Sequence, residues 1–152
     1  MQAKSFIEGE LMKRVYVNEK WCLGCKLCEY YCAFANSGLK DMVKALKNRK
    51  ISSRIYVDNI DDVTFAVNCR HCKEPICVKS CITGALQKAD GAVVIDKEKC
   101  VGCCTCVLVC PYGAISYDGG KSVLKCQLCI DNGGIPTCVQ NCPNQAIVFE
   151  ER

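Results

Sequence analysis

The sequence has few of the residues with which enzymes perform acid–base or nucleotide chemistry. It contains one histidine, His71, and one tryptophan, Trp21, among its 152 residues. No glycine-rich dinucleotide motif follows a predicted strand, no P-loop is present, and no histidine–aspartate pair accompanies a nucleophile. We therefore expect a protein without a catalytic site of its own.

Long hydrophobic runs are also missing. No apolar stretch is long enough to cross a bilayer, and residues 1–20 contain neither the apolar core of a secretory signal nor a twin-arginine pair. We expect a cytoplasmic protein without direct membrane insertion. Residues 1–12 carry no motif and are interpreted as an N-terminal extension.

Cysteine, in contrast, is abundant, with 17 residues, and sixteen of them form four quartets. A disulfide scaffold is disfavoured, because the count is odd, the spacing is regular and no secretory signal precedes the quartets. Zinc is disfavoured because structural zinc sites usually combine one C-x2-C with a distant second pair. The quartets are Cys22, Cys25, Cys28 and Cys32; Cys69, Cys72, Cys77 and Cys81; Cys100, Cys103, Cys106 and Cys110; and Cys126, Cys129, Cys138 and Cys142.

The third quartet shows best which cofactor these cysteines suit. It lies in KCVGCCTCVLVCPYGAI (Lys99–Ile115), with the spacing C-x2-C-x2-C-x3-C and Pro111 directly after it. This spacing is typical of a cubane [4Fe–4S] cluster, and the fourth cysteine of such a motif ligates a second cluster. Four thiolates fill all the iron sites, so the chemistry expected is electron transfer and not substrate binding at iron.

The spacing between quartets predicts how they share ligands. Between Cys81 and Cys100 lies one predicted hairpin, as in a two-cluster bacterial ferredoxin, so the second and third quartets should exchange their last cysteines. The first and fourth quartets are then left for each other. The four expected sites are Cys69, Cys72 and Cys77 with Cys110; Cys100, Cys103 and Cys106 with Cys81; Cys22, Cys25 and Cys28 with Cys142; and Cys126, Cys129 and Cys138 with Cys32.

Two residues near these ligands have their own interpretation. His71 lies inside the second quartet, which already has four cysteines, so we expect it to hydrogen-bond near the cluster and tune its potential instead of binding iron. Cys104, the seventeenth cysteine, is interpreted as a small buried filler, with a spare ligand or a redox-active thiol as the alternative.

The formal net charge of +4 counts every thiol as neutral. Sixteen thiolates add sixteen negative charges, and four oxidised cores of charge +2 add eight positive charges. The net charge of the cluster-loaded protein is therefore expected to be about −4. A nucleic-acid partner, which a basic chain would suggest, is therefore not expected.

The remaining patterns predict an α+β fold of two nested two-cluster ferredoxin modules, with short hairpins and short helices. Alternating residues predict strands at 13–17, 55–57, 63–67, 92–95 and 146–149, and a second hairpin at 114–124. The outer module is expected at 13–33 plus 118–152 and the inner module at 54–117. Residues 34–53 are an insertion with a lysine-rich helix at Leu39–Lys50, either a solvated surface or a docking face for an acidic partner.

With CRHCKEPIC and the third quartet as its most specific pieces, residues 13–150 resemble a family of four-cluster ferredoxin-like subunits. This family accompanies dimethyl-sulfoxide reductase, formate dehydrogenase, hydrogenase and carbon monoxide dehydrogenase. The chain is most similar to the iron–sulfur partner of carbon monoxide dehydrogenase or to the small subunit of tungsten or molybdenum aldehyde or formate oxidoreductases. The resemblance implies four [4Fe–4S] clusters on the sixteen cysteines and a role in anaerobic metabolism.

The function expected is a non-catalytic subunit that carries electrons between a catalytic oxidoreductase subunit and a second redox partner, such as a ferredoxin, a flavoprotein or a hydrogenase. A freely diffusing polyferredoxin that shuttles electrons is the alternative. A scaffold in which clusters serve only as staples is disfavoured, because four clusters exceed what 152 residues need for folding.

Overall fold

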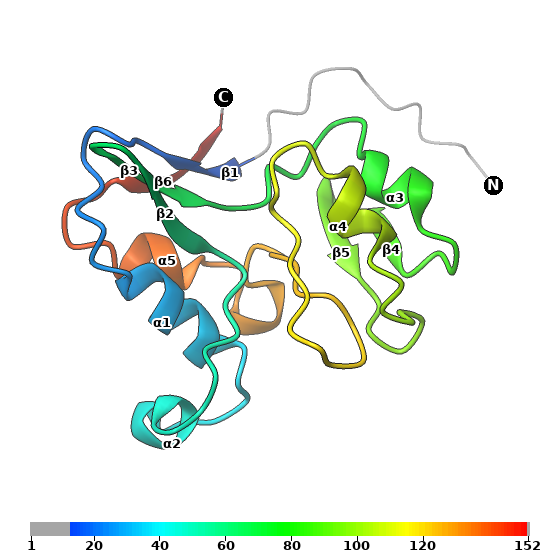
Figure 1. The fold of residues 1–152 in the computed structure, drawn as a ribbon, viewed down its shortest axis with the longest axis horizontal. Helices are drawn as coiled ribbons and strands as arrows, with labels where there is room; N and C mark the ends of the chain where they lie inside the picture. Colours follow the sequence, from blue (N-terminus) through cyan, green and yellow to red (C-terminus); the bar gives the residue numbers. More distant parts are fainter. Residues whose placement is uncertain (1–12, 152) are drawn as a thin grey trace.

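The strand predicted at residues 13–17 is present as β1 (Lys13–Val17), and its partner lies at the opposite end of the chain. β6 (Ile147–Glu151) pairs with β1 in antiparallel register, with Lys13 opposite Glu151 and Val17 opposite Ile147. The computed structural model describes residues 13–151, which form an α+β fold of two lobes (Figure 1). The α+β class and the ferredoxin-like character predicted from the sequence are confirmed.

The first lobe is built around the β1–β6 pair. α1 (Leu27–Ala35) lies beside α5 (Thr137–Gln140), and the hairpin of β2 (Tyr56–Ile60) and β3 (Val63–Val67) contacts both α1 and β1. A 3-10 turn, η1 (Ile130–Asn132), precedes α5, and the Asn132 amide donates to the carbonyl of Ala35 at 3.0 Å. This lobe therefore combines segments from both ends of the chain.

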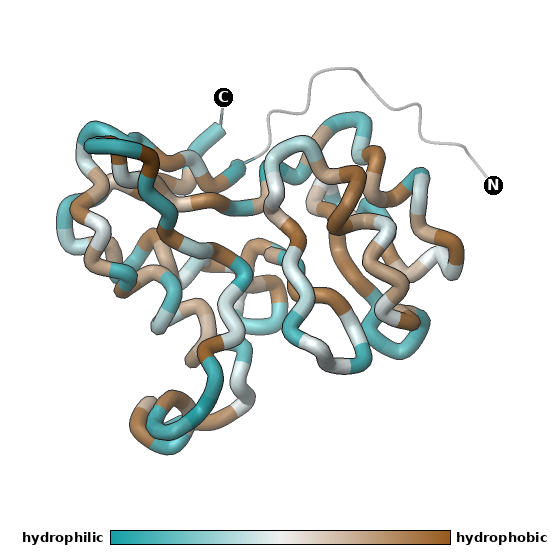
Figure 2. Tube along the Cα trace, viewed as in Figure 1, coloured by the Kyte–Doolittle hydropathy of each residue, from teal (hydrophilic) through white to brown (hydrophobic). Residues whose placement is uncertain are grey.

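The second lobe is continuous in sequence. It contains α3 (Ile76–Ser80), the hairpin of β4 (Leu86–Ala89) and β5 (Ala92–Ile95), and α4 (Thr105–Val109), which packs beside α3. The hairpin turns at Asp90 and Gly91, which both have positive φ, as a tight two-residue turn between twisted strands requires. Figure 2 shows the hydrophobic colour concentrated along α4 and β5 in this lobe.

Each lobe has its own small core, and cysteines are part of both. In the first lobe Val15, Ile55 and Ile147 are buried together with Cys28, Cys32 and Cys138. In the second lobe Leu86, Val93 and Val123 are buried with Cys100 and Cys106. Because so few large apolar side chains are buried, the cores contribute little stability by themselves.

Two expectations differ from the structure. The helix predicted over 39–50 is a single turn, α2 (Met42–Leu46), which begins at the Asp41 cap and ends because Lys47 is extended and Asn48 has positive φ. The hairpin predicted at 114–124 is one isolated bridge between Ser116 and Leu124.

Within residues 13–151, no helix combines the length and the apolar character that crossing a bilayer requires.

Candidate metal centres

The four cysteine loops share a backbone conformation that turns the chain sharply. The residue before the second cysteine has positive φ in every loop, namely Gly24, His71, Gly102 and Leu128. Loops one and three also have the same backbone conformation at the residue after the second cysteine. Lys26 and Cys104 both have φ of 62°, with ψ of 11° and 10°. The internal repeat seen in the sequence is therefore also a repeat of backbone geometry.

A short helix then places the third and fourth cysteines of each quartet one turn apart. Cys28 and Cys32 both lie on α1, Cys77 lies on α3 with Cys81 at its end, and Cys106 lies on α4 with Cys110 at its end. Residues four apart share one face of a helix, about one turn of 5.4 Å along its axis. Each helix can thus present one thiol to its own loop and one to a neighbouring loop.

The first expected ligand group, which we call site A, is assembled around one cavity. Cys22, Cys25 and Cys28 from the first loop line it together with Cys142, which follows α5. The backbone N–H of Ala146 donates to the Cys142 sulfur at 3.2 Å. Burial raises the pKa of Cys28 to about 12, and its neighbours Cys25 and Cys22 add to this shift.

Site B is the expected group of Cys126, Cys129, Cys138 and Cys32. Burial is the largest cause that raises the pKa of Cys138, and Cys126, Cys32 and Cys129 also contribute. Backbone N–H groups point at two of these sulfurs, from Arg54 to Cys32 at 3.2 Å and from Leu128 to Cys126 at 3.4 Å.

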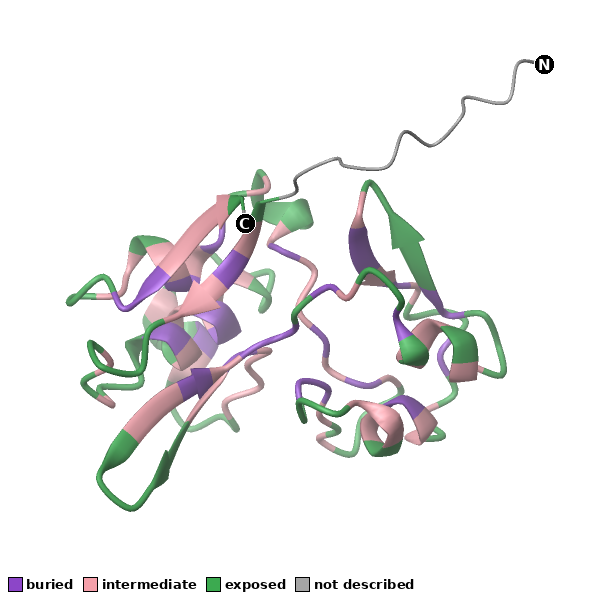
Figure 3. Cartoon of the chain, turned by 90° about the horizontal axis from the view of Figure 1, so that it is seen from above, coloured by how far each residue is buried: buried purple, intermediate pink, exposed green. Residues whose placement is uncertain are grey.

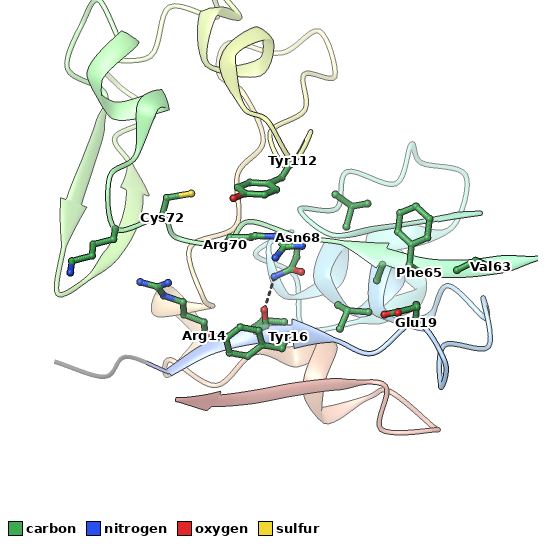
Figure 4. A pocket seen from close by; sticks show the side chains of 14 residues that line it. Arg14, Tyr16, Glu19, Val63, Phe65, Asn68, Arg70, Cys72 and Tyr112 are labelled. Carbon is green, nitrogen blue, oxygen red and sulfur yellow. Dashed lines mark hydrogen bonds between the residues drawn. The ribbon is translucent and has the colours of Figure 1, made fainter. Parts of the chain in front are cut away.

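Site C consists of Cys69, Cys72, Cys77 and Cys110. Burial raises the pKa of Cys77, with smaller contributions from Cys69 and Cys110, so these three thiols are neighbours. Cys72 instead lines a groove between the lobes, together with Arg14, Arg70 and Tyr112, and Figure 4 shows its sulfur on the side of Tyr112. The Arg70 guanidinium lies 4.7 Å from the centre of the Tyr112 ring.

Site D is assembled around a second cavity, which is lined by Cys100, Cys103, Cys106 and Cys81. The hydroxyls of Thr83 and Thr105 lie 3.7 Å and 3.5 Å from the sulfurs of Cys81 and Cys103. The Thr105 hydroxyl is the largest cause that lowers the pKa of Cys103. Cys104 also lines this cavity, but its thiol donates to the carbonyl of Gly102 at 3.4 Å.

The donor chemistry of these sites fits a [4Fe–4S] cluster. Sites A and D each gather four soft thiols around one cavity, and backbone N–H groups point at sulfur, as they do around clusters of this kind. Among residues 13–151, no three His, Cys, Asp or Glu side chains form a group that would hold a metal ion. Cys28, Cys126 and Cys106 have pKa values raised by burial to about 12, 12 and 11, so the free thiols are protonated near neutral pH.

Cysteines of different expected sites also affect one another. Cys28 of site A contributes to the raised pKa of Cys138 in site B, and Cys69 of site C contributes to that of Cys126 in site B. Cys77, Cys81 and Cys110 pack against the core that contains Cys100 and Cys106. The core of the first lobe thus includes cysteines of sites A and B, and the core of the second lobe includes cysteines of sites C and D.

His71 is not placed as a metal ligand. It is fully buried, its Nδ1 accepts the backbone N–H of Val93 at 3.0 Å, and its Nε2 has no partner among residues 13–151. Burial, followed by Lys125 and Arg14, lowers its pKa to about 3, so the imidazole is neutral. Lys125 is also buried, and its burial was not predicted from the sequence. A lysine directly before a cysteine also occurs at Lys99, whose side chain is exposed, so this pattern does not indicate burial.

Comparisons with known proteins agree on the kind of protein. Residues 60–152 match the family described as "4Fe-4S dicluster domain". The chain is 37% identical over 150 residues to an "Iron-sulfur protein" of Rhodospirillum rubrum, a match that covers 88% of this chain and 79% of that one. It is 34% identical over 149 residues to the B subunit of anaerobic dimethyl sulfoxide reductase from Escherichia coli (strain K12), covering 88% and 71%.

A solved structure also has a similar fold. It is the active site complex BamBC of benzoyl coenzyme A reductase in complex with zinc. The TM-score is 0.50 at 22% sequence identity, over 95% of this chain and 81% of the other. At this identity the likeness concerns the fold alone.

Proposed function

The chain belongs to the 4Fe-4S dicluster domain family, and we propose that it is a non-catalytic subunit that carries electrons through four [4Fe–4S] clusters between a catalytic oxidoreductase subunit and a second redox partner. The observation that carries the proposal is that Cys142 and Cys81 line the cavities of the first and third cysteine loops, in sites A and D. We propose that the four sites form a row in the order A, B, C, D. The sixteen cysteines are the proposed ligands, paired so that two modules nest in each other.

The two ends of the row are the proposed points where electrons enter and leave. Cys25 in site A and Cys103 in site D are the cysteines classed as exposed. Exposed apolar side chains line both cavities, with Leu23 at 68% in site A and Val101 at 63% in site D. Sites whose ligands are least covered allow the shortest approach of a partner, and exposed apolar patches mark surfaces where proteins bind.

Bound clusters of this type supply one-electron chemistry without an open iron position. The residues of this chain hold the ligands in place, with backbone N–H groups and threonine hydroxyls directed at sulfur. Such hydrogen bonds stabilise the more negative, reduced state and so contribute to the potential of each site.

The catalytic partner is proposed from chemistry shared with the relatives. One relative is the B subunit of anaerobic dimethyl sulfoxide reductase. We propose a partner of the same broad kind, a carbon monoxide dehydrogenase or a tungsten or molybdenum aldehyde or formate oxidoreductase in the cytoplasm. A ferredoxin, flavoprotein or hydrogenase is the proposed second partner, and neither nucleic acid nor membrane insertion has a role.

The test combines an iron assay with purification from native cells. Four loaded sites predict about sixteen irons per chain and co-elution with a large oxidoreductase subunit. Cys104→Ser is the matched control for Cys103→Ser, because the control should keep full loading while its neighbour loses site D. About eight irons would contradict the four-cluster assignment, and elution as a lone monomer would favour a freely diffusing polyferredoxin.

A further inference from the structure

Two polar side chains are completely enclosed where the lobes meet. His71 is 0% exposed and Lys125 is 1% exposed, and Lys125 is the sole lysine or arginine classed as buried within residues 13–151. Figure 3 shows buried stretches along the segments that connect the lobes. No ion pair within the described residues involves Lys125. An enclosed ammonium group without a carboxylate is costly, so it indicates an anionic neighbour.

The backbone of one residue, Val93, contacts both of these side chains. The N–H of Val93 donates to Nδ1 of His71 at 3.0 Å, and the carbonyl of the same residue accepts from Nζ of Lys125 at 2.6 Å. Lys125 also donates to the carbonyl of Cys126 at 2.8 Å. His71, Val93 and Lys125 therefore form a continuous hydrogen-bonded chain, which we call the junction.

The junction runs from the loop of site C to the loop of site B. His71 lies between Cys69 and Cys72, and its backbone N–H donates to the Cys69 sulfur at 3.4 Å. Lys125 precedes Cys126, and it acts electrostatically on Cys126 of site B and on Cys77 of site C.

The hydrogen bonding leaves one donor of the junction free. Because Nδ1 of His71 accepts a hydrogen bond, the proton of the neutral ring is on Nε2, which is buried without a partner among the described residues. Nε of Arg14, which acts on the same imidazole, is also buried without a partner among them. Within residues 13–151, His71 and Arg14 therefore each have an enclosed donor without a partner, and Lys125 has an enclosed cation without an ion pair.

We propose that the junction is a positioning device for electron transfer between sites B and C. Lys125 supplies a buried positive charge that favours the reduced state of both middle clusters, and His71 supplies a fixed N–H donor on the site C side. Val93 connects the two, so that the lobes are held at one separation. This inference rests on the proposed function, since it requires clusters at sites B and C.

The test is redox potentiometry of the intact, iron-loaded protein, followed by electron paramagnetic resonance. In Lys125→Met the equilibrium constant for reduction at two of the four sites should fall about tenfold, a shift of about 59 mV to lower potential. The sign follows because a nearby cation stabilises the state with one more negative charge. The other two reduction steps should stay unchanged.

Lys99→Met is the matched control. Lys99 precedes Cys100 as Lys125 precedes Cys126, but its side chain is 54% exposed and pairs with Asp96 at 3.5 Å. The same loss of charge in solvent should shift each equilibrium constant less than twofold, and added salt should remove that shift. The shift in Lys125→Met should persist in salt, because the charge is enclosed.

Other outcomes also decide the matter. Equal small shifts in Lys125→Met and Lys99→Met, with full iron loading, would overturn the junction while leaving the four-cluster function intact. Lys125→Met could also lose iron from two sites. In that case, a Lys125→Arg protein with full iron loading and unchanged potentials supports a requirement for the positive charge. Equal loss of iron in both variants overturns that requirement. A wild-type protein without clusters at B and C would instead refute the proposed function.

Discussion

At the scale of single residues, the metal-binding loops depend on a left-handed backbone before the second cysteine. Gly24 and Gly102 adopt it at φ of 69°, as the flexible residue suited to this conformation. His71 and Leu128 adopt it as non-glycine residues at φ of 45° and 55°. His71 is held there by burial and by its bond to Val93, so its strained backbone and its place in the junction belong together.

Gly24→Ala tests the importance of this geometry for site A. A methyl group would add left-handed strain and would also meet Cγ2 of Thr64 at 2.9 Å. The strain alone costs about 1–2 kcal/mol. We expect a lower melting temperature together with earlier loss of visible absorbance from the cluster.

Gly38→Ala is the control for Gly24→Ala. Gly38 has a similar φ of 73°, but its added methyl would have open space around it. It should lose stability from strain only, without earlier bleaching. If both variants bleach alike, the close approach of Thr64 has no bearing on site A.

At the scale of elements, the helices are too short to be stable by themselves. α3 and α4 have five residues each and α5 has four, well below the length at which isolated helices persist in water. Each is fixed at the cysteines it carries and by its neighbour, α1 beside α5 and α3 beside α4. The helices therefore act as spacers that set two thiols one turn apart.

Of the α-helices within residues 13–151, α2 is the one that carries no cysteine. Its cap is Asp41, whose carboxylate accepts the N–H groups of Val43 at 2.9 Å and Lys44 at 3.2 Å. Ala45 is buried, whereas Lys40, Lys44 and Lys47 are exposed. A surface with this charge suits an acidic partner.

Changing Lys40, Lys44 and Lys47 to Glu should weaken binding of the partner subunit. Charge steering across an interface is screened by salt, so the difference from wild type should shrink as ionic strength rises. Affinity measured at two salt concentrations checks this. Unchanged affinity in low salt would mean that the lysines face only solvent.

At the scale of the whole molecule, folding and metal loading are expected to be one process. Five ligand cysteines, Cys28, Cys32, Cys100, Cys106 and Cys138, are buried members of the two cores. The ligands of site A come from the two ends of the chain, so iron closes a loop that the β1–β6 pair and the packing of α1 on α5 also close. Metal binding in such small proteins contributes directly to the free energy of folding.

Removing iron under reducing conditions should therefore abolish most of the secondary structure. Circular dichroism before and after chelation measures this, and reconstitution with iron and sulfide should restore the signal. The Cys104→Ser protein is the control for general thiol effects, because it keeps all the proposed ligands. An iron-free chain with a fully native spectrum would contradict the coupling of folding to metal.

The local features could be predicted from the sequence because each depends on neighbours along the chain. Strand β1 follows from alternation in KRVYV, the β4–β5 hairpin from Asp90-Gly91, and the grouping of the thiols from the cysteine spacing. The exchange of Cys81 and Cys142 with loops distant in sequence was also predicted, because the spacing repeats. The structure brings both to those loops, in the cavities of sites D and A.

Other features depend on contacts that no local pattern encodes. α2 is shorter than its apolar spacing predicts, because nothing large packs over Val43, which stays 64% exposed. Lys99 and Lys125 look alike in sequence, each directly before a cysteine, yet one lies in solvent and the other is enclosed. The two lysines differ in exposure because the fold buries Lys125, where its ammonium group donates to the carbonyl of Val93.

The amino-acid sequence by itself determined the chemistry of this protein, since soft sulfur ligands at these intervals suit iron–sulfur clusters and little else. Only the tertiary structure decided which cysteines share a cavity and which polar groups are buried beside them. Ligand chemistry is a property of residue type and spacing, whereas the environment of a buried charge is set by segments that meet from distant parts of the chain.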